Sequence, residues 1–545
     1  MKLKGLFALA VSIIIVLGIV CVPVSAASND NVIVYSAVND FKVPNEYLYG
    51  RKQLESMENS SYLLALYDAL YNGVENCSKT ITIDDPDGIF VKNHVTDNNK
   101  FSYIWNTAWE AYSNDHPEQF WWAYTPAGEN QVYKVTNVKF STFEGASTSM
   151  SFELAYDNDL YNNKEKFENE VRKLLYGLTS NTDEYTREKI IHDRLISKVT
   201  YVKADHDYNA YGAIIDGKAV CEGYSRALQY LLMRAGIFSH TVTGLAYDYE
   251  AKVYVNHAWN LVKIHGDYYY VDATWDDKET LTSYAYFNVD DYQTIEYDHV
   301  PYNIIHGTYE YTYTIPPCVS MQYNYYVYDR GIIIDTFDTK QIADALSENG
   351  TARIISFDTD LFINFLDLYD EDLQGDKEIV KSLGITGGYD YGGLQTYGEI
   401  IPYLYKENTM TVYGTVAGVD NSEKTTVELI KDGEVKYSQQ LNKAVCDYNF
   451  NNIVMSDYTL KVSKNGHTVY TEQIIGDYSV AQIKDVTLYL YGDVNSDGSF
   501  NISDLVRLKK AMANNTEMNE KAFNITSSSQ YADKLVEMRK MLFAL

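Results

Sequence analysis

The segment AVCEGYSRALQYLLMRAG, residues 219–236, constrains the fold of this 545-residue chain more than any other stretch. Its apolar residues recur with the helical period and a glycine closes it, so it predicts a helix that starts at Cys221. The start of a helix favours an anion, and the thiolate is the nucleophilic form of cysteine, which makes Cys221 a candidate nucleophile. A buried structural thiol is the alternative for this residue by itself. The predicted apolar stripe comprises Tyr224, Leu228, Leu231, Leu232 and Ala235.

A histidine and an aspartate follow in NHAWNLVKIHGDYYYVDATWDD, residues 256–277. The pattern around the central glycine predicts a β-hairpin whose second strand runs over residues 268–275. In that register Asp272 lies on the same face as His257, within diagonal reach of its imidazole. A nucleophile, a general base and a carboxylate that holds the base are the groups that nucleophilic catalysis needs. The sequence therefore predicts that these two residues act together with the cysteine.

The motifs CEGYS, HAW and VDATWDD, in this order, resemble those of the transglutaminase-like superfamily, whose members use a papain-like cysteine–histidine–aspartate triad. The resemblance covers about residues 180–310, because the upstream YTREKIIHDRLISKVTYV and YNAYGAIIDGKAVC also agree with it. It implies a papain/transglutaminase-like core in which Cys221 is the nucleophile, His257 the base and Asp272 the orienting residue. All three motifs are intact, which favours an active enzyme over a pseudoenzyme.

Three neighbours of these motifs have ordinary structural explanations. We expect Trp259 to shield the histidine from solvent or to pack in the core. We expect Asp276 and Asp277 to cap the end of a strand, with a contact to substrate as the alternative for one of them.

The first 26 residues have the pattern of a signal peptide. Lys2 and Lys4 precede a continuous apolar run, and Val24-Ser25-Ala26 offers a cleavage site with small residues. We therefore expect a secreted, extracellular protein, with a retained membrane anchor as the alternative. No later stretch is apolar for long enough to span a membrane.

Charge and cysteine content exclude several classes of protein. The formal net charge is −30 and no basic cluster occurs, which argues against binding to nucleic acid or anionic membranes. After the signal peptide the cysteines are Cys77, Cys221, Cys318 and Cys446, too few and too scattered for a disulfide framework. The sequence predicts no disulfide and no cofactor for catalysis.

The chain is too long for one hydrophobic core, and its length suggests about three to five domains. The helix and strand patterns of the segments predict a multidomain α+β protein. Residues 403–489 carry short alternating strands with Asp-Gly and Asn-Gly turns, which favours a β-sandwich spacer. This segment resembles the carboxypeptidase-regulatory-like module. The predicted parts are a signal peptide (1–26), an α+β accessory region (27–179), the catalytic domain (180–310), an α+β appendage (311–402), the β-sandwich (403–489) and a tail (490–545).

The tail begins with a candidate calcium loop, GDVNSDGSFNISD. Oxygen-bearing side chains alternate, a glycine that permits a sharp turn stands sixth at Gly498, and a carboxylate closes the loop at the twelfth position. The predicted ligands are the side chains of Asp493, Asn495, Asp497, Asn501 and Asp504 and the backbone carbonyl of Ser499.

The helix LVRLKKAM at 505–512 recurs as LVEMRKML at 535–542. A duplicated loop and helix at the end of a chain resembles a dockerin, an EF-hand-like, calcium-dependent module that binds a cohesin on a scaffoldin. The resemblance implies attachment to a cellulosome-type scaffold of a Gram-positive anaerobic bacterium. Ahead of the second helix, KAFNITSSSQYADK lacks the ligand pattern, so one calcium ion is predicted rather than two.

Together these features predict a secreted thiol enzyme that acts on peptide or glutamine-type amide bonds. Attack by Cys221 would form a thioester, and hydrolysis by water, as in a cysteine peptidase, is favoured over transfer to an amine. A protein-crosslinking transglutaminase is the first alternative. The second is a non-catalytic, dockerin-borne component that only binds or assembles.

Overall fold

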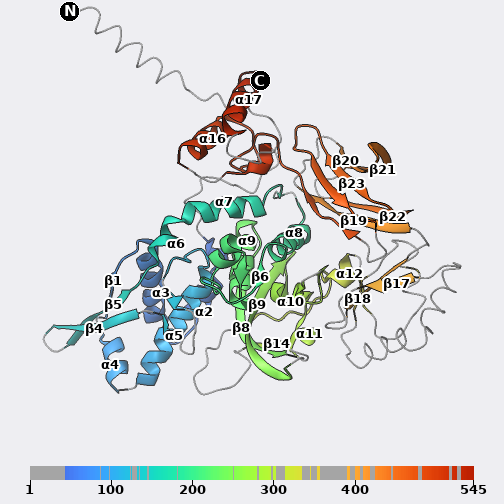
Figure 1. Cartoon of the computed structure of the whole chain (residues 1–545). Coiled ribbons are helices and arrows are strands. Elements are labelled where there is room, and N and C mark those ends of the chain that lie inside the picture. The colour runs from blue at the N-terminus through green and yellow to red at the C-terminus, as the bar shows by residue number, and fades with distance from the viewer. Residues whose placement is uncertain are drawn as a thin grey trace, which may run out of the picture. The chain divides into compact units, whose positions relative to one another are not determined.

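The structure is a computed structural model, traced in Figure 1. The predicted signal peptide lies outside the residues that it describes. No helix in the described part is long and apolar enough to cross a membrane. The described part comprises residues 43–544 except 86, 97, 123, 126–131, 134, 144–145, 179, 181, 249–250, 279–280, 296–298, 302–313, 330, 334–343, 345–352, 356–388, 393–398, 405–408, 418–423, 443–445, 477–481, 515–517 and 524–529.

The N-terminal region is α+β, as the sequence predicts. The apolar faces of its helices pack together, and buried residues such as Leu63 and Tyr67 belong to the same hydrophobic cluster as Leu228 further along the chain. A three-stranded antiparallel sheet in the order β1-β5-β4 adjoins the helices. The elements are η1 (Asn45–Tyr47), α2 (Tyr49–Glu55), α3 (Ser60–Glu75), β1 (Thr80–Asp84), α4 (Ile89–Thr96), α5 (Asn98–Asp115), β2 (Tyr124–Thr125), β3 (Val132–Tyr133), β4 (Val135–Phe143), β5 (Ala146–Leu154), α6 (Asn158–Asn162) and α7 (Lys164–Leu174).

The predicted helix at the cysteine is confirmed as α9, Cys221–Arg234. All five residues of its predicted apolar stripe are buried. The helix ends before Gly236, whose φ of 77° suits a residue without a side chain. The chain reaches it through α8 (Glu184–Ile196), β6 (Thr200–Tyr201), the π-helical turn η2 (Gly212–Asp216) and β7 (Lys218–Ala219).

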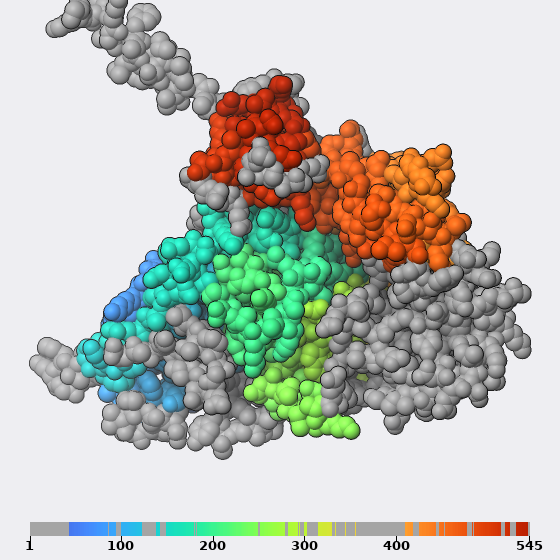
Figure 2. All heavy atoms as spheres, viewed as in Figure 1, coloured from blue at the N-terminus to red at the C-terminus, as the bar shows by residue number. Residues whose placement is uncertain are grey.

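Helix α9 packs against a five-stranded antiparallel sheet of order β13-β10-β9-β8-β14 (Figure 1). On the face drawn in Figure 2, atoms coloured teal to yellow-green form one continuous surface, so side chains fill the spaces between these ribbons. The strands are β8 (Ser239–Asp248), β9 (Val253–Ile264), β10 (Asp267–Val271), β13 (Phe287–Val289) and β14 (His299–Pro301); near them lie α10 (Ala273–Asp276), β11 (Asp277–Lys278), β12 (Leu281–Thr282) and α11 (Asp291–Ile295).

The predicted hairpin is present as β9 and β10, but its second strand is shorter than expected. Strand β10 ends at Val271 instead of running to Trp275. The reason is local, because the side chain of Asp272 accepts hydrogen bonds from the N–H groups of Thr274 and Trp275 and so caps the helical turn α10. The strand therefore ends just before Asp272, the predicted orienting residue.

The remaining described segments add two further groups of strands and several helices. The sheet β15-β16-β18-β17 pairs β15 and β16 in parallel, and two sheets between β19 and β26 share one hydrophobic cluster, as expected for a β-sandwich. The elements are α12 (Tyr325–Tyr328), β15 (Gly331–Ile333), β16 (Arg353–Ile355), β17 (Tyr389–Gly392), β18 (Glu399–Leu404), β19 (Thr409–Ala417), β20 (Thr425–Lys431), β21 (Glu434–Leu441), β22 (Cys446–Val454), β23 (Tyr458–Ser463), β24 (Tyr470–Ile474), β25 (Gln482–Ile483), β26 (Val486–Thr487), α16 (Ile502–Asn514), η3 (Glu520–Phe523) and α17 (Tyr531–Ala544).

Candidate active site

Cys221 is the first residue of α9, and its side chain is half-buried. The preceding residue, Val220, has an extended backbone and makes no side-chain cap, so the helix begins abruptly at the thiol. The loop before it is held close, since the Val220 N–H donates to the Asp207 carbonyl at 3.0 Å. A side chain at Gly223 would lie 2.2 Å from that same carbonyl oxygen, which explains why glycine follows Cys221 and Glu222. The glycine thus lets the loop pack against the first turn of the helix.

His257 and Asp272 form the closest contact of the site. Their Nε2 and Oδ2 atoms lie 2.6 Å apart, and both residues are buried. The other oxygen of Asp272, Oδ1, accepts from the N–H groups of Thr274 and Trp275, and its backbone N–H donates to the Tyr286 carbonyl. The carboxylate is therefore oriented by the backbone on one side and holds the imidazole with the other.

The charge of this pair follows from its contacts. Burial by itself lowers the pKa of His257, but the charge and hydrogen bond of Asp272, with a hydrogen bond to the Cys221 side chain, raise it to about 9. Burial by itself raises the pKa of Asp272, yet hydrogen bonds and charge from His257 and His299 hold it well below its ordinary value. At neutral pH the imidazole is therefore protonated, and it lies beside the Cys221 side chain.

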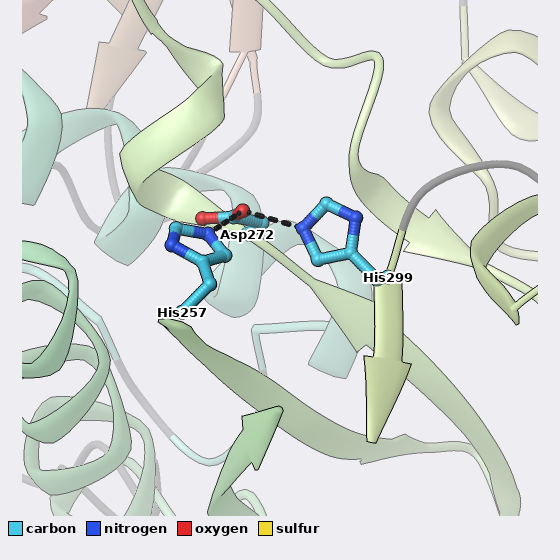
Figure 3. Close-up of side chains that lie close together, drawn as sticks. All are labelled: His257, Asp272 and His299. Carbon is cyan, nitrogen blue, oxygen red and sulfur yellow. Dashed lines mark hydrogen bonds and ion pairs between the residues drawn. The ribbon is translucent and has the colours of Figure 1, made fainter. Parts of the chain in front are cut away.

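A second histidine, His299, contacts the same carboxylate oxygen. Its Nε2 lies 2.9 Å from Asp272 Oδ2, on the opposite side from His257 (Figure 3). His299 begins β14, the edge strand beside β8, and is almost fully buried. Its sequence position gave no signal, because it lies 27 residues beyond Asp272 and outside every motif.

Aromatic rings surround the two histidines. The Trp259 ring lies 6.1 Å from that of His257 and 5.0 Å from that of His299, and the Trp275 ring lies 5.2 Å and 4.6 Å from the same two rings. Trp259 is 1% exposed, so it packs in the core while it shields the histidines. The rings lower the local dielectric, which strengthens the interaction of the imidazoles with Asp272.

Asp276 and Asp277 have structural partners. Asp276 is fully buried, accepts from the Tyr286 N–H and lies 3.2 Å from Nε2 of His192 on α8. Asp277 accepts from the Tyr224 hydroxyl at 2.5 Å. Both contacts fasten the chain just after Asp272 to neighbouring helices.

The predicted calcium ligands extend from the loop before α16 into the first turn of that helix, which holds Asp504. Asp493 accepts from the N–H groups of Asp497 and Gly498, and Asp504 accepts from those of Asn495 and Asn501. Burial and the neighbouring carboxylates raise the pKa of Asp493, and burial is the main cause that raises that of Asp504 to about 7. Buried carboxylates that repel one another are the donor set that a divalent cation neutralises, so these residues fit the predicted ion.

Comparison with known proteins identifies one part of the chain. The family described as the transglutaminase-like superfamily matches residues 172–273, which include Cys221, His257 and Asp272. Residues 172–273 are a transglutaminase-like domain. The chain is therefore a mixed α and β protein with a transglutaminase-like core and several β-sheets. No curated protein matches the chain.

Three solved structures show weak similarity. A transglutaminase (TGase) is 19% identical over 26% of this chain and 44% of its own, with a TM-score of 0.15. A candidate cysteine protease from Cytophaga hutchinsonii is 15% identical over 25% of this chain and 61% of its own, with a TM-score of 0.18. A type II cohesin–X–dockerin complex from Acetivibrio cellulolyticus is 14% identical over 23% of this chain and 94% of its own, with a TM-score of 0.13. The chain spans less than two thirds of the first two, and TM-scores at this level do not establish a shared function.

The candidate active site also brings together residue types that can bind a metal ion. Among the described residues, His257, Asp272 and His299 offer ligand atoms within 4.8 Å of one another. Both imidazoles, however, point at one carboxylate oxygen at hydrogen-bonding distance, whereas metal ligands point at a common position outside all of them. Protons between these residues therefore account for the geometry.

The pKa of His257 leads to a prediction for the pH dependence of the transglutaminase-like domain. Because its pKa is about 9, the imidazole of His257 is protonated at neutral pH and loses its proton as the pH rises through about 9. Because protonated His257 is the group that can donate to a leaving amine, kcat/KM should fall with an apparent pKa near 9. The measurement is kcat/KM against pH, with the rate of Cys221 alkylation as the control, because alkylation requires no proton donor to a leaving amine. An alkaline limb near neutrality would contradict the assignment.

Proposed function

We propose that this protein is a secreted thiol enzyme that cleaves peptide or glutamine-type amide bonds. The observation that carries the proposal is the series of contacts from Cys221 to His257 and from His257 to Asp272, with the half-buried Cys221 at the start of α9. Such a series supplies the nucleophile, the proton donor and acceptor, and the group that orients it.

The proposed reaction has two steps. The Cys221 thiolate attacks the amide carbonyl carbon, and protonated His257 donates its proton to the leaving amine, which leaves a thioester. Neutral His257 then accepts a proton from water as the water attacks the thioester. The C–S bond breaks, which releases the acid and restores the thiolate and the protonated imidazole. The backbone N–H of Cys221, at the first position of α9, is a candidate donor to the oxyanion of both steps.

Hydrolysis is favoured over crosslinking because the Cys221 thiol is only half-buried. In the described part of the chain, Tyr201 interacts electrostatically with both Cys221 and Asp272 and is 57% exposed. Transfer to an amine requires that water be kept from the thioester, and these contacts do not enclose it. A crosslinking activity remains the alternative outcome of the experiment below.

We further propose that the tail attaches the enzyme to a cohesin-bearing scaffold and that one calcium ion supports its fold. The support is the donor set of the loop, Asp493 to Asp504, followed at once by helix α16. The dockerin-like pattern of the sequence suggests the partner, and the signal-like N-terminus suggests the location. Attachment would then hold the enzyme on the scaffold.

The test is a reaction of the purified chain with iodoacetamide, a peptide library and a labelled amine. We expect Cys221 to alkylate well below the pH at which an ordinary thiol reacts, and peptides to be cleaved without incorporation of the amine. Cys221→Ala is the control, because Cys77 and Cys446 are also partly exposed and contribute background alkylation. Amine incorporation would select the crosslinking alternative. Slow alkylation that Cys221→Ala leaves unchanged would favour a non-catalytic binding or structural component.

A further inference from the structure

Asp272 holds two imidazoles, although a triad requires only one. Its Oδ2 atom accepts from Nε2 of His257 at 2.6 Å and from Nε2 of His299 at 2.9 Å. His299 lies beyond residues 172–273, so the family match does not include it. Figure 3 shows the carboxylate between the two rings, which approach it from different strands.

The sheet is built to bring the second ring to this place. In the register of the strands, Gly244 of β8 lies opposite both His257 and Pro301, and Ala246 lies opposite His299. The two histidines therefore share one face of the sheet, with only small residues of β8 between them. A side chain at Gly244 would lie 2.3 Å from the Val300 carbonyl oxygen and would push β14 away.

The contact completes the fixation of the carboxylate. Oδ1 is held by two backbone N–H groups of α10, whereas Oδ2 is held by the two imidazoles. A donor on the far side of Oδ2 limits rotation of the carboxylate away from His257. It also satisfies a second lone pair of a buried anion, which would otherwise carry a desolvation cost.

We propose that His299 is a positioning residue, which holds the Asp272 carboxylate against His257 by donating a hydrogen bond to their shared oxygen. The inference rests on the proposed function, and it concerns a residue that the triad itself does not include. In this role His299 acts through Asp272.

The experiment compares His299→Phe, which keeps a ring of similar size, with His299→Gln, whose amide N–H can replace the imidazole donor. We expect His299→Phe to lower kcat by about 10- to 100-fold with little change in KM, as for other small displacements of catalytic groups. We expect His299→Gln to restore most of the loss. The alkaline limb of kcat/KM should move to lower pH in the phenylalanine variant only, because Asp272 no longer stays in contact with His257.

The pH readout depends on the titratable groups around the pair. Those that face it are Cys221 from α9, His299 from β14, Tyr201 of β6 and Asp276 of α10. Only residue 299 differs between the variants. A shift of the alkaline limb of kcat/KM therefore reports whether this residue donates a hydrogen bond. A merely structural role would lower the melting temperature of both variants alike and leave the limb in place.

A double-mutant cycle with Asp272→Asn makes the test independent of folding. If His299 acts through the carboxylate, His299→Phe should lower kcat only slightly when Asp272 is already replaced by asparagine. Equal losses in both backgrounds, or a phenylalanine variant with unchanged kcat and pH profile, would overturn the inference. Loss of activity on chelation, with rescue by added zinc, would overturn it in favour of a metal held by these residues.

Failure of this inference can be distinguished from failure of the proposed function. Wild-type protein and Cys221→Ala report whether the chain is a thiol enzyme at all. The alkylation rate of Cys221 against pH needs no substrate, so the three His299 proteins can be compared by it even before a substrate is known. If Cys221 of the wild type alkylates fast and both His299 variants show the same alkylation rates as the wild type, the enzyme proposal stands and the positioning role is rejected.

Discussion

Replacing Asp272 with asparagine is expected to lower kcat/KM by about 10⁴-fold, the effect known when the aspartate of a triad is so replaced. The asparagine side chain has one oxygen, and the N–H groups of Thr274 and Trp275 compete for it with the two imidazoles. If the oxygen caps α10, the amide N–H₂ faces His257. That imidazole must then accept at Nε2 and carry its proton on Nδ1, where it cannot take the proton of Cys221.

The measurement is kcat/KM for the best peptide found in the library, with thermal unfolding to check that the variant folds. Asp267→Asn is the matched control, because it lies at the other end of β10 and is exposed. It should retain wild-type activity. A loss of less than about tenfold in Asp272→Asn would mean that His257 does not depend on this carboxylate, and the proposed mechanism would fail.

The second large effect concerns calcium. An ion present at 1,000 times its dissociation constant stabilises the folded state by about 4 kcal/mol, enough to decide whether a small module folds. Its removal should therefore unfold the tail, because the buried carboxylates of Asp493 and Asp504 would repel each other without it. Activity on a free peptide should not change, since the triad lies in residues 221–272.

Isothermal titration calorimetry and limited proteolysis test this expectation. The wild type should bind one calcium ion, and a chelator should expose α16 and α17 to protease. Asp504→Ala should abolish both responses, whereas Asp533→Ala, an exposed residue on α17, should change neither. Binding of two ions would contradict the prediction that the second half of the tail has lost its loop.

Much of the active-site region could be predicted from the sequence because its patterns are local. Helix α9 follows from the apolar period between Tyr224 and Ala235 and from the glycine that closes it. The hairpin of β9 and β10 follows from a tight turn, whose register places residue 257 opposite residue 274 if continued. A pairing that is set by neighbours along the chain can be read from the chain.

What lies further apart was decided by the tertiary structure. The end of β10 at Val271 is seen only in the structure. There the Asp272 side chain accepts hydrogen bonds from the backbone of the following turn, which takes the place of further strand pairing. Only the structure placed His299 on Asp272, through a strand order in which β14 lies beside β8 and Gly244 leaves room between them. The sequence by itself determined the cysteine helix, the hairpin and the three triad residues. The contact of His299 with Asp272 depends on two strands that are distant in the sequence and pair in one register. The periodicity of a sequence does not encode which strands become neighbours in a sheet.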